Sequence, residues 1–428
     1  MKRTLAVIVN IVGAVLLACG QTGAWSGDIE VQGTRLPVVF HLDDDRPCMD
    51  SPAQGARGIP IQIDRSAPDS IKVNIPAIGG SYVARYNGEE LVGTFAQRGV
   101  RLPLILSPGE RTANRPQTPL PPYPYAQEEV AFTNGNATLR GTLTLPEGYS
   151  RKAPVVIMVT GSGLQNRDEE IFDHRPFAVI ADALAREGIA SLRYDDRGFG
   201  ESTGDAVNCT TEDLMHDALA SVKLLRERFD RVGVLGHSEG GTIALMLAAD
   251  GEADFIVSLA GMVVSGKETL LDQNRYALSR AGYSQEVTDE YCSLVGAAFD
   301  GDKFVLVRLI ASTLPNELKQ NLQAALKQLN TPYMQYTLTL DMRGRLGDIH
   351  CPVLALNGTK DTQVSCEKNL AALRNGLPAS AANKIESLDG LNHLFQRCTT
   401  GSVNEYALIE ETISPTALTL ITDWIKNR

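Results

Sequence analysis

From about residue 128 onward, the sequence alternates short apolar runs with amphipathic segments. The runs "APVVIMVTG", "RVGVLGH" and "CPVLALNG" have the length and composition of buried strands, whereas "PFAVIADALAREGI" and "TTEDLMHDALASVKLLRERF" have the period of helices. This alternation predicts a mostly parallel sheet covered by helices on both faces. The alternation is interrupted at about residues 262–346, where helical segments lie between two predicted strands. We interpret this part as a helical cap.

The residues before this alternation have a different texture. Short stretches between residues 25 and 106 alternate apolar and polar side chains without a helical period, which predicts a small all-β domain. Residues 107–127 are rich in proline and are interpreted as a stiff linker, so that residues 128–428 form the second domain. A chain of 428 residues with a net charge of −11 suits two domains and argues against a nucleic-acid surface or an anionic membrane partner.

Residues 1–20 are predicted to be an export signal. The charged start "MKR" is followed by the apolar run "TLAVIVNIVGAVLLA", which is too short for a confident membrane span. The run ends in "LLACG", which resembles a bacterial lipobox and would make Cys19 the lipidated first residue of the mature protein. The alternative is ordinary cleavage after Gly20. Either reading predicts export to the bacterial cell envelope, as a lipoprotein or in the periplasm.

Six further cysteines are present, and none of their spacings is a zinc pattern. An oxidising compartment would permit one disulfide among Cys351, Cys366 and Cys398, and buried free thiols are the alternative.

The spacing G-x-S-x-G occurs twice, as "GESTG" at 200–204 and as "GHSEG" at 236–240. The second copy follows the apolar strand "VGVL" and leads directly into a helix, which is the strand–turn–helix context of a nucleophilic serine. The first copy lies in a predicted loop. Ser238 is therefore the candidate nucleophile, and Ser202 is interpreted as a turn residue.

A serine nucleophile needs a histidine base and an acid that orients it. His393 follows the predicted strand "NKIESL" in a Gly/Asn loop, and Asp361 follows the strand "PVLALNG". The chain order Ser238, Asp361, His393 is that of the α/β-hydrolase fold. Asp389 competes with Asp361 because it lies four residues before His393. Weaker acid candidates are Asp341 and Asp348.

The oxyanion hole of such a site needs two N–H donors. We expect one from Glu239, directly after the nucleophile, and the other from the glycine-containing loop "GSGLQNRDE". The N–H of Ser162 is favoured in that loop, with Gly163 as the alternative. The loop lacks the G-K-[ST] of a phosphate-binding loop, and no metal or organic cofactor is expected.

Taken together, these residues resemble the α/β-hydrolase superfamily of serine esterases and peptidases. The motifs "TGSGLQNRDE", "RYDDRGFGESTG", "GHSEGG", "CPVLALNGTKDTQV" and "LNHLFQ", with "GTFAQRGVRLPL" before them, resemble more narrowly the exported two-domain bacterial carboxylesterases that carry an N-terminal β domain. The resemblance implies that "RYDDRGFGESTG" is a structural loop. It also implies that Arg167 and Asp168 form a loop ion pair without a part in the chemistry.

The expected function is a serine carboxylesterase that hydrolyses short-to-medium acyl esters through an acyl-enzyme. Its partner would be a small-molecule or carbohydrate ester. Two alternatives stay open at this stage: a serine aminopeptidase on the same fold, with Glu239 or a carboxylate of the cap holding the free amine, and a surface lipoprotein whose β domain binds a ligand.

Overall fold

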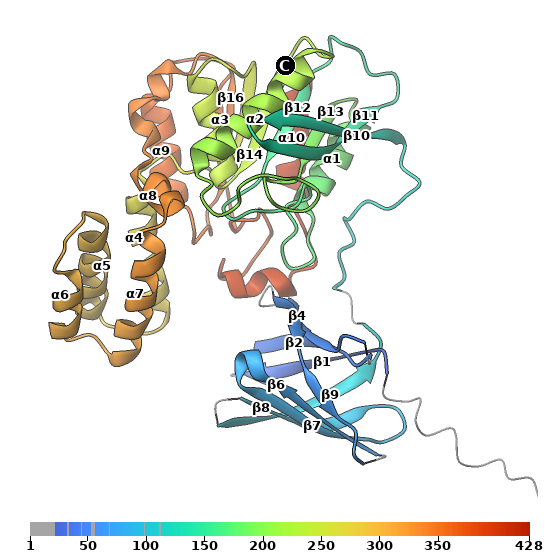
Figure 1. The fold of residues 1–428 in the computed structure, drawn as a ribbon. Coiled ribbons are helices and arrows are strands. Elements are labelled where there is room, and N and C mark those ends of the chain that lie inside the picture. Colours follow the sequence, from blue (N-terminus) through green and yellow to red (C-terminus); the bar gives the residue numbers. More distant parts are fainter. Residues whose placement is uncertain are drawn as a thin grey trace, which may run out of the picture. The chain divides into compact units, whose positions relative to one another are not determined.

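The chain divides into two compact units, Met1–Asn114 and Arg115–Arg428 (Figure 1). The predicted signal segment and Cys19 lie outside the described residues, so export and lipidation stay predictions. The structure is a computed structural model, and the residues that it describes are 22–31, 34–43, 45–52, 56–67, 69–97, 99–110 and 113–428.

The first unit is a sheet of nine strands in the order β4-β3-β2-β1-β9-β8-β7-β6-β5. Alternate side chains of its strands point into one apolar core, where the rings of Phe40 and Tyr82 lie 5.5 Å apart. The prediction of a small all-β domain is thereby confirmed. The strands are β1 (Ala24–Val31), β2 (Thr34–His41), β3 (Cys48–Ser51), β4 (Ala56–Pro60), β5 (Gln62–Asp64), β6 (Ser70–Ile75), β7 (Gly80–Tyr86), β8 (Leu91–Gln97) and β9 (Val100–Pro108), with a 3-10 turn, η2, at Pro76–Ile78.

The second unit contains a sheet of eight strands in the order β10-β11-β13-β12-β14-β15-β16-β17. An antiparallel hairpin, β10 and β11, forms one end of the sheet, and the pairs from β13 to β17 are parallel. The predicted, mostly parallel sheet is thus confirmed. The strands are β10 (Tyr125–Asn134), β11 (Ala137–Pro146), β12 (Val155–Val159), β13 (Ala190–Tyr194), β14 (Val232–His237), β15 (Phe255–Leu259), β16 (Val353–Gly358) and β17 (Lys384–Leu388).

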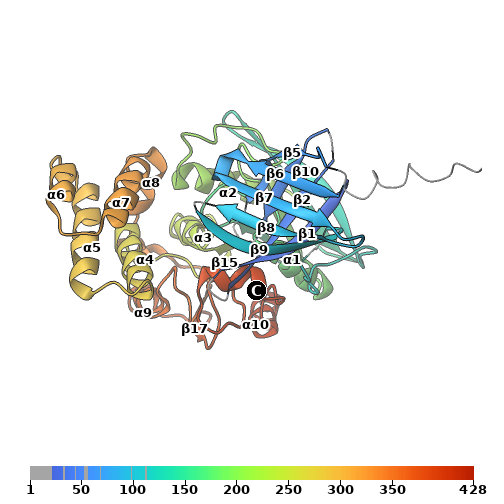
Figure 2. The ribbon, with the colours of Figure 1, turned by 90° about the horizontal axis from the view of Figure 1, so that it is seen from below.

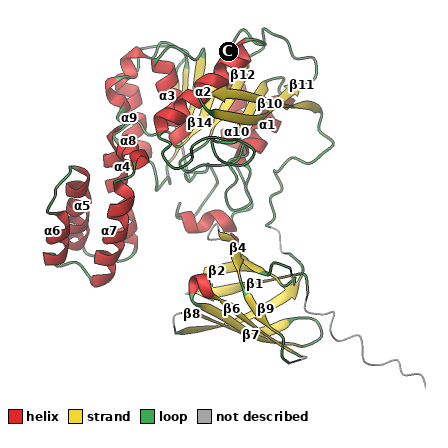
Figure 3. Ribbon diagram, viewed as in Figure 1, coloured by secondary structure: helices red, strands yellow, loops and turns green. Residues whose placement is uncertain are grey.

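Helices cover both faces of this sheet, as its continuously buried strands require (Figure 3). Side chains of β12 alternate between two apolar clusters: Val155 and Ile157 pack with one set of helices, and Val156 and Met158 with the other. The first set is α2 (Thr211–Arg226), α3 (Glu239–Ala249) and α9 (Cys366–Gly376), and the second is α1 (Pro176–Arg186) and α10 (Pro415–Lys426).

The cap is inserted between β15 and β16 and has its own apolar core, which includes Leu294, Leu318 and Leu322. Figure 2 shows its helices gathered on one side of the second unit. Three of the five helices were predicted from their periodicity, whereas α6 and α8, which are only seven and eight residues long, were not predicted. The cap helices are α4 (Gly266–Arg280), α5 (Gln285–Phe299), α6 (Val305–Ala311), α7 (Asn316–Leu329) and α8 (Pro332–Thr339). Short 3-10 turns follow at η3 (Met342–Gly344) and η4 (Leu346–Asp348), and a third, η5, lies at Val403–Leu408.

The six cysteines among the described residues are free thiols, so the disulfide considered for Cys351, Cys366 and Cys398 is not present. None of the helices in the described part of the chain is both long and apolar enough to cross a membrane.

Close backbone packing around the β14–α3 turn should make it intolerant of any side chain at Gly236. A Cβ atom there would lie 1.9 Å from the Gly240 carbonyl oxygen, so Gly236→Ala should lower the free energy of unfolding by about 3 kcal/mol, at the upper end of overpacking costs. Gly347→Ala is the matched control, since nothing lies within 4 Å of its Cβ position. Chemical denaturation measures both, and equal stability of the two variants would contradict this account of the turn.

Candidate active site

Ser238 occupies a sharp turn between strand β14 and helix α3. Its backbone has φ 53° and ψ −117°, a left-handed conformation that costs a residue with a side chain on the order of 1–3 kcal/mol. Glycines at positions 236 and 240 allow the strand and the helix to approach closely enough to hold this turn. The Ser238 backbone is therefore fixed at the end of a central strand, with the N-terminus of a helix directly after it.

His393 and Asp361 come together from the loops that follow β17 and β16. Nδ1 of His393 lies 2.7 Å from Oδ2 of Asp361, and both side chains are almost completely buried. The other carboxylate oxygen of Asp361 accepts hydrogen bonds from the N–H groups of Gln363 and Val364, at 2.8 and 2.9 Å. The carboxylate is thus held on both sides, and it fixes the orientation of the imidazole.

The competing acids lie in other environments. Asp389 accepts a hydrogen bond from the Thr359 hydroxyl at 3.0 Å, and Asp341 pairs with Arg343. Asp348 is exposed. Of the acids that the sequence offered, Asp361 is the one that contacts His393.

The loop after β12 passes directly beside the candidate nucleophile. A Cβ atom at Gly161 would lie 3.2 Å from Cβ of Ser238. The Gly161 N–H donates to Oε1 of Glu169 at 2.7 Å and is therefore already used. Within the described residues, the N–H groups of Ser162 and Glu239 have no hydrogen-bond partner from another element. They are the two donors that the sequence analysis favoured for the oxyanion hole.

A cavity of about 310 Å³ brings these groups together. Ser162, Ser238 and His393 all line it, so the candidate nucleophile, base and oxyanion donor face one space. Apolar side chains and side-chain amides make up much of the remaining lining, namely Ile171, Met262, Val364 and Leu394 with Gln165, Gln273 and Gln363. Gly161, Glu169 and His237 complete it.

A buried ion pair under the site was not anticipated from the sequence. Glu169 and His237 are 3% and 7% exposed, and Oε1 of Glu169 lies 3.0 Å from Nδ1 of His237. The other ring nitrogen of His237 lies 2.9 Å from the backbone oxygen of His393. Glu169 also accepts the hydrogen bond from the Gly161 N–H. The pair therefore connects the loop after β12, which carries Ser162, with the loop after β17, which carries His393.

Burial by itself lowers the pKa of His237, but the facing carboxylate of Glu169 and the hydrogen bonds outweigh it and raise the pKa above its ordinary value. His237 is therefore the protonated partner of the pair over a wider pH range than a free histidine. The only clue in the sequence was the position of both residues in motifs next to the site.

Glu239, directly after Ser238, carries a third buried carboxyl group of the site, after those of Asp361 and Glu169. The Thr211 and Tyr333 hydroxyls donate to its two oxygens, each at 2.6 Å, and Tyr333 belongs to the cap helix α8. Burial raises the pKa of Glu239, although these hydrogen bonds and one with the Ser162 side chain act against the rise. Since Glu239 is 1% exposed and already bonded, it is not available to hold the amine of a substrate.

The hydroxyl of Ser202, in the other G-x-S-x-G sequence, makes two hydrogen bonds to the backbone. Its hydroxyl donates to the Asp195 backbone oxygen at 2.7 Å and accepts from the Arg140 N–H at 2.9 Å. Ser202 is not among the residues that line the cavity with His393. This arrangement agrees with its interpretation as a turn residue.

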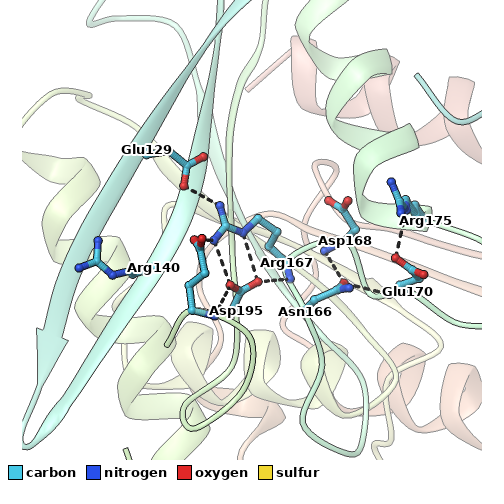
Figure 4. A pocket seen from close by; sticks show the side chains of 9 residues that line it. Glu129, Arg140, Asn166, Arg167, Asp168, Glu170, Arg175 and Asp195 are labelled. Atoms are coloured by element: carbon cyan, nitrogen blue, oxygen red, sulfur yellow. Dashed lines mark hydrogen bonds and ion pairs between the residues drawn. The ribbon is translucent and has the colours of Figure 1, made fainter. Parts of the chain in front are cut away.

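The expected ion pair between Arg167 and Asp168 is wrong. Figure 4 shows Arg167 turned toward Asp195 and Glu129, and it also pairs with Glu201. Asp168 instead pairs with Arg193 of strand β13. Neighbouring side chains in a loop point in different directions. Arg167 therefore pairs with carboxylates of other strands and loops, and Asp168 pairs with a guanidinium of another strand. Both residues nevertheless form ion pairs, and neither is among the residues that line the cavity of Ser238.

The remaining histidines do not meet Ser238. His174 is buried against Thr412 and the Tyr406 backbone, and burial lowers its pKa to about 4. His216 and His350 are exposed, and His41 belongs to the first unit.

Comparisons with known proteins give relatives for part of this chain. Residues 174–281 match the family model described as "Serine aminopeptidase, S33", a segment that includes Ser238. Esterase EstD of Thermotoga maritima is 31% identical over 292 residues, which cover 67% of this chain and 65% of that esterase. The chain thus spans slightly less than two thirds of the length of this relative.

Two solved structures illustrate the similarity of the fold. The esterase PF2001 of Pyrococcus furiosus has a TM-score of 0.46 and 16% identity, covering 74% of this chain and 99% of its own. Est1E of Butyrivibrio proteoclasticus has a TM-score of 0.41 and 17% identity, covering 70% of this chain and 96% of its own.

The Glu169–His237 pair leads to a pH-dependent prediction. A histidine whose pKa is raised on folding contributes stability that is fully present below its unfolded pKa, about 6.5, and is lost as the pH rises through the folded value. Glu169→Gln should therefore lower the free energy of unfolding by about 3 kcal/mol at pH 6, the cost of breaking a buried pair, and by clearly less at pH 9.

Glu170→Gln is the matched control, because Glu170 pairs with Arg175 at the surface. Its effect should stay within about 1 kcal/mol at both pH values. Denaturant unfolding of the three proteins at pH 6 and pH 9 measures this, and a loss for Glu169→Gln that is as large at pH 9 as at pH 6 would contradict the titration of His237 as the source of the pH dependence.

Proposed function

We propose that this chain is a serine carboxylesterase of the α/β-hydrolase superfamily and that it acts on short-to-medium acyl esters. The observation that carries the proposal is the shared cavity: Ser238, on its sharp turn, faces the same space as His393, which Asp361 holds at 2.7 Å. The relationship to an esterase of Thermotoga maritima supports the same class of reaction.

In the proposed mechanism, the Ser238 oxygen attacks the ester carbonyl carbon while His393 takes the hydroxyl proton. The negative charge that develops on the carbonyl oxygen accepts hydrogen bonds from the N–H groups of Ser162 and Glu239. As the tetrahedral intermediate collapses, its bond to the alcohol breaks and His393 returns the proton to the leaving oxygen. An acyl group then remains on Ser238.

Water completes the reaction by the reverse sequence. His393 takes a proton from a water molecule, whose oxygen attacks the acyl carbon, and the Ser238 oxygen leaves with that proton. Throughout both halves, Asp361 keeps Nδ1 of His393 as the donor and stabilises the imidazolium. The enzyme is regenerated, and the products are the alcohol and the carboxylic acid.

The cavity supports an ester with a modest acyl group. At about 310 Å³ it lies at the lower end of small-molecule sites, and apolar side chains make up part of its wall. Among its described lining residues the one carboxylate is Glu169, which is already paired with His237 and bonded to Gly161. No lining carboxylate of the described chain is thus left for a substrate amine, which favours an ester over an aminopeptidase substrate.

We also propose that the protein is exported, with Cys19 as the lipidated first residue. The basis is the charged start, the apolar run and the lipobox-like ending of residues 1–20. Metabolic labelling with a radioactive fatty acid should mark the wild type but not Cys19→Ala, and an unlabelled wild type would leave cleavage after Gly20 as the better reading.

Ser238→Ala should abolish hydrolysis of p-nitrophenyl acetate and butyrate, by about 10³-fold or more in kcat, because the nucleophile is lost. Ser202→Ala is the matched control, since Ser202 has the same motif but a structural hydroxyl, and its folded fraction should retain activity. The measurement is initial rates on purified, folded variants.

The same assay separates the ester from the amide reading. The wild type should turn over these esters far faster than aminoacyl p-nitroanilides. Equal loss in the two folded serine variants would contradict the nucleophile, whereas faster cleavage of the anilides would contradict the carboxylesterase but not Ser238.

A further inference from the structure

Three metal-ligating side chains of different types meet on the hairpin of strands β2 and β3 in the first unit. His41, the last residue of β2, lies directly opposite Cys48, the first residue of β3. Asp50 follows two residues after Cys48 and therefore lies on the same face of the sheet. One ligand atom from each of the three residues lies within 4.8 Å of the other two.

Both oxygens of the Asp50 carboxylate have partners that fix its orientation. Its Oδ1 accepts a hydrogen bond from the Gly58 N–H of strand β4 at 2.6 Å. Its Oδ2 points to Nε2 of His41 at 3.1 Å. The Asp50 and His41 side chains are 10% and 27% exposed, so the group is partly shielded and still reachable from water.

An ordinary His–Asp ion pair accounts for only two members of the group. Ligands bound to Zn²⁺ at 2.0–2.3 Å in a tetrahedron lie roughly 3.3–3.8 Å apart. The separation of His41 and Asp50 is already close to this value, and the Cys48 thiol needs only a small movement to reach it. Among the described residues, this is the one group of three His, Cys, Asp or Glu side chains whose ligand atoms all lie within 4.8 Å of one another.

We propose that His41, Cys48 and Asp50 bind a divalent transition-metal ion, with Zn²⁺ as the best match. A thiolate, an imidazole and a carboxylate together suit a cation of intermediate softness rather than Mg²⁺ or Ca²⁺, which prefer oxygen ligands. Three protein ligands leave the fourth position of a tetrahedral ion to water. Bound metal would join the two ends of the 42–47 connection and stabilise this hairpin near the edge of the sheet.

Co²⁺ is the probe, because a cobalt–thiolate bond absorbs in the near ultraviolet and reports the cysteine directly. Titration of the reduced protein should give this band with saturation at one equivalent, and Zn²⁺ should displace it. Cys48→Ser should lose the band and weaken binding by roughly tenfold or more. Cys351→Ser is the matched control: Cys351 is also half-buried, lies in the other unit, and its loss should leave the band unchanged.

Asp50→Asn provides a second variant that keeps an oxygen for the Gly58 N–H while removing the charge. It should retain the thiolate band but bind Co²⁺ more weakly, by roughly tenfold or more. Circular dichroism checks that each variant is folded. Two results would overturn the proposal: no saturable thiolate band in the wild type, or a band and affinity that are unchanged in Cys48→Ser. Ester hydrolysis is not a readout, so failure here leaves the proposed function untouched.

Discussion

The strained turn at Ser238 is the constraint on which the rest of the second unit depends. A residue with a side chain stays at φ 53° only if the surrounding structure fixes it there. Strand β14 lies near the centre of a buried sheet, and helix α3 is buried along nearly its whole length, from Glu239 to Ala248. Gly240 lies against the backbone oxygen of Val159. The packing energy of two apolar layers thus holds one serine in place.

Around this turn, polar contacts link loops that lie far apart in the sequence. Glu169 connects Gly161 with His237, His237 reaches the backbone of His393, and Tyr333 of the cap reaches Glu239. Burial makes each of these contacts costly to break, because an unpaired charge or hydroxyl would remain in a dry interior. The base, the oxyanion loop and the cap are therefore stabilised as one network.

The sequence predicted those parts of this arrangement that depend on local patterns. Periodicity identified the sheet and its covering helices, and the flanks of "GHSEG" distinguished Ser238 from Ser202. The position of Asp361 after an intervening strand placed it ahead of Asp389, and the contact with His393 agrees with that choice. The first unit was recognised as all-β from alternation alone.

Long-range side-chain contacts were beyond such patterns. Glu169 and His237 are 68 residues apart, and Tyr333 and Glu239 are 94 residues apart, so no spacing connects them. The Arg167–Asp168 pair was wrong because adjacency in a loop does not fix side-chain direction. Helix α8, which carries Tyr333, was missed because eight residues give too little periodicity. His41, Cys48 and Asp50 are close in sequence, but their meeting requires the strand register of β2 and β3.

The central claim is that Ser238 is the activated nucleophile, and covalent labelling tests it most directly. The folded protein would be treated with a fluorophosphonate, digested with trypsin and mapped by mass spectrometry. Trypsin separates the two motifs, since Ser202 falls in the peptide 198–223 and Ser238 in 232–267. The account predicts one label per chain, on Ser238, and none after prior unfolding. A label on Ser202, or no label in the folded protein, would contradict it.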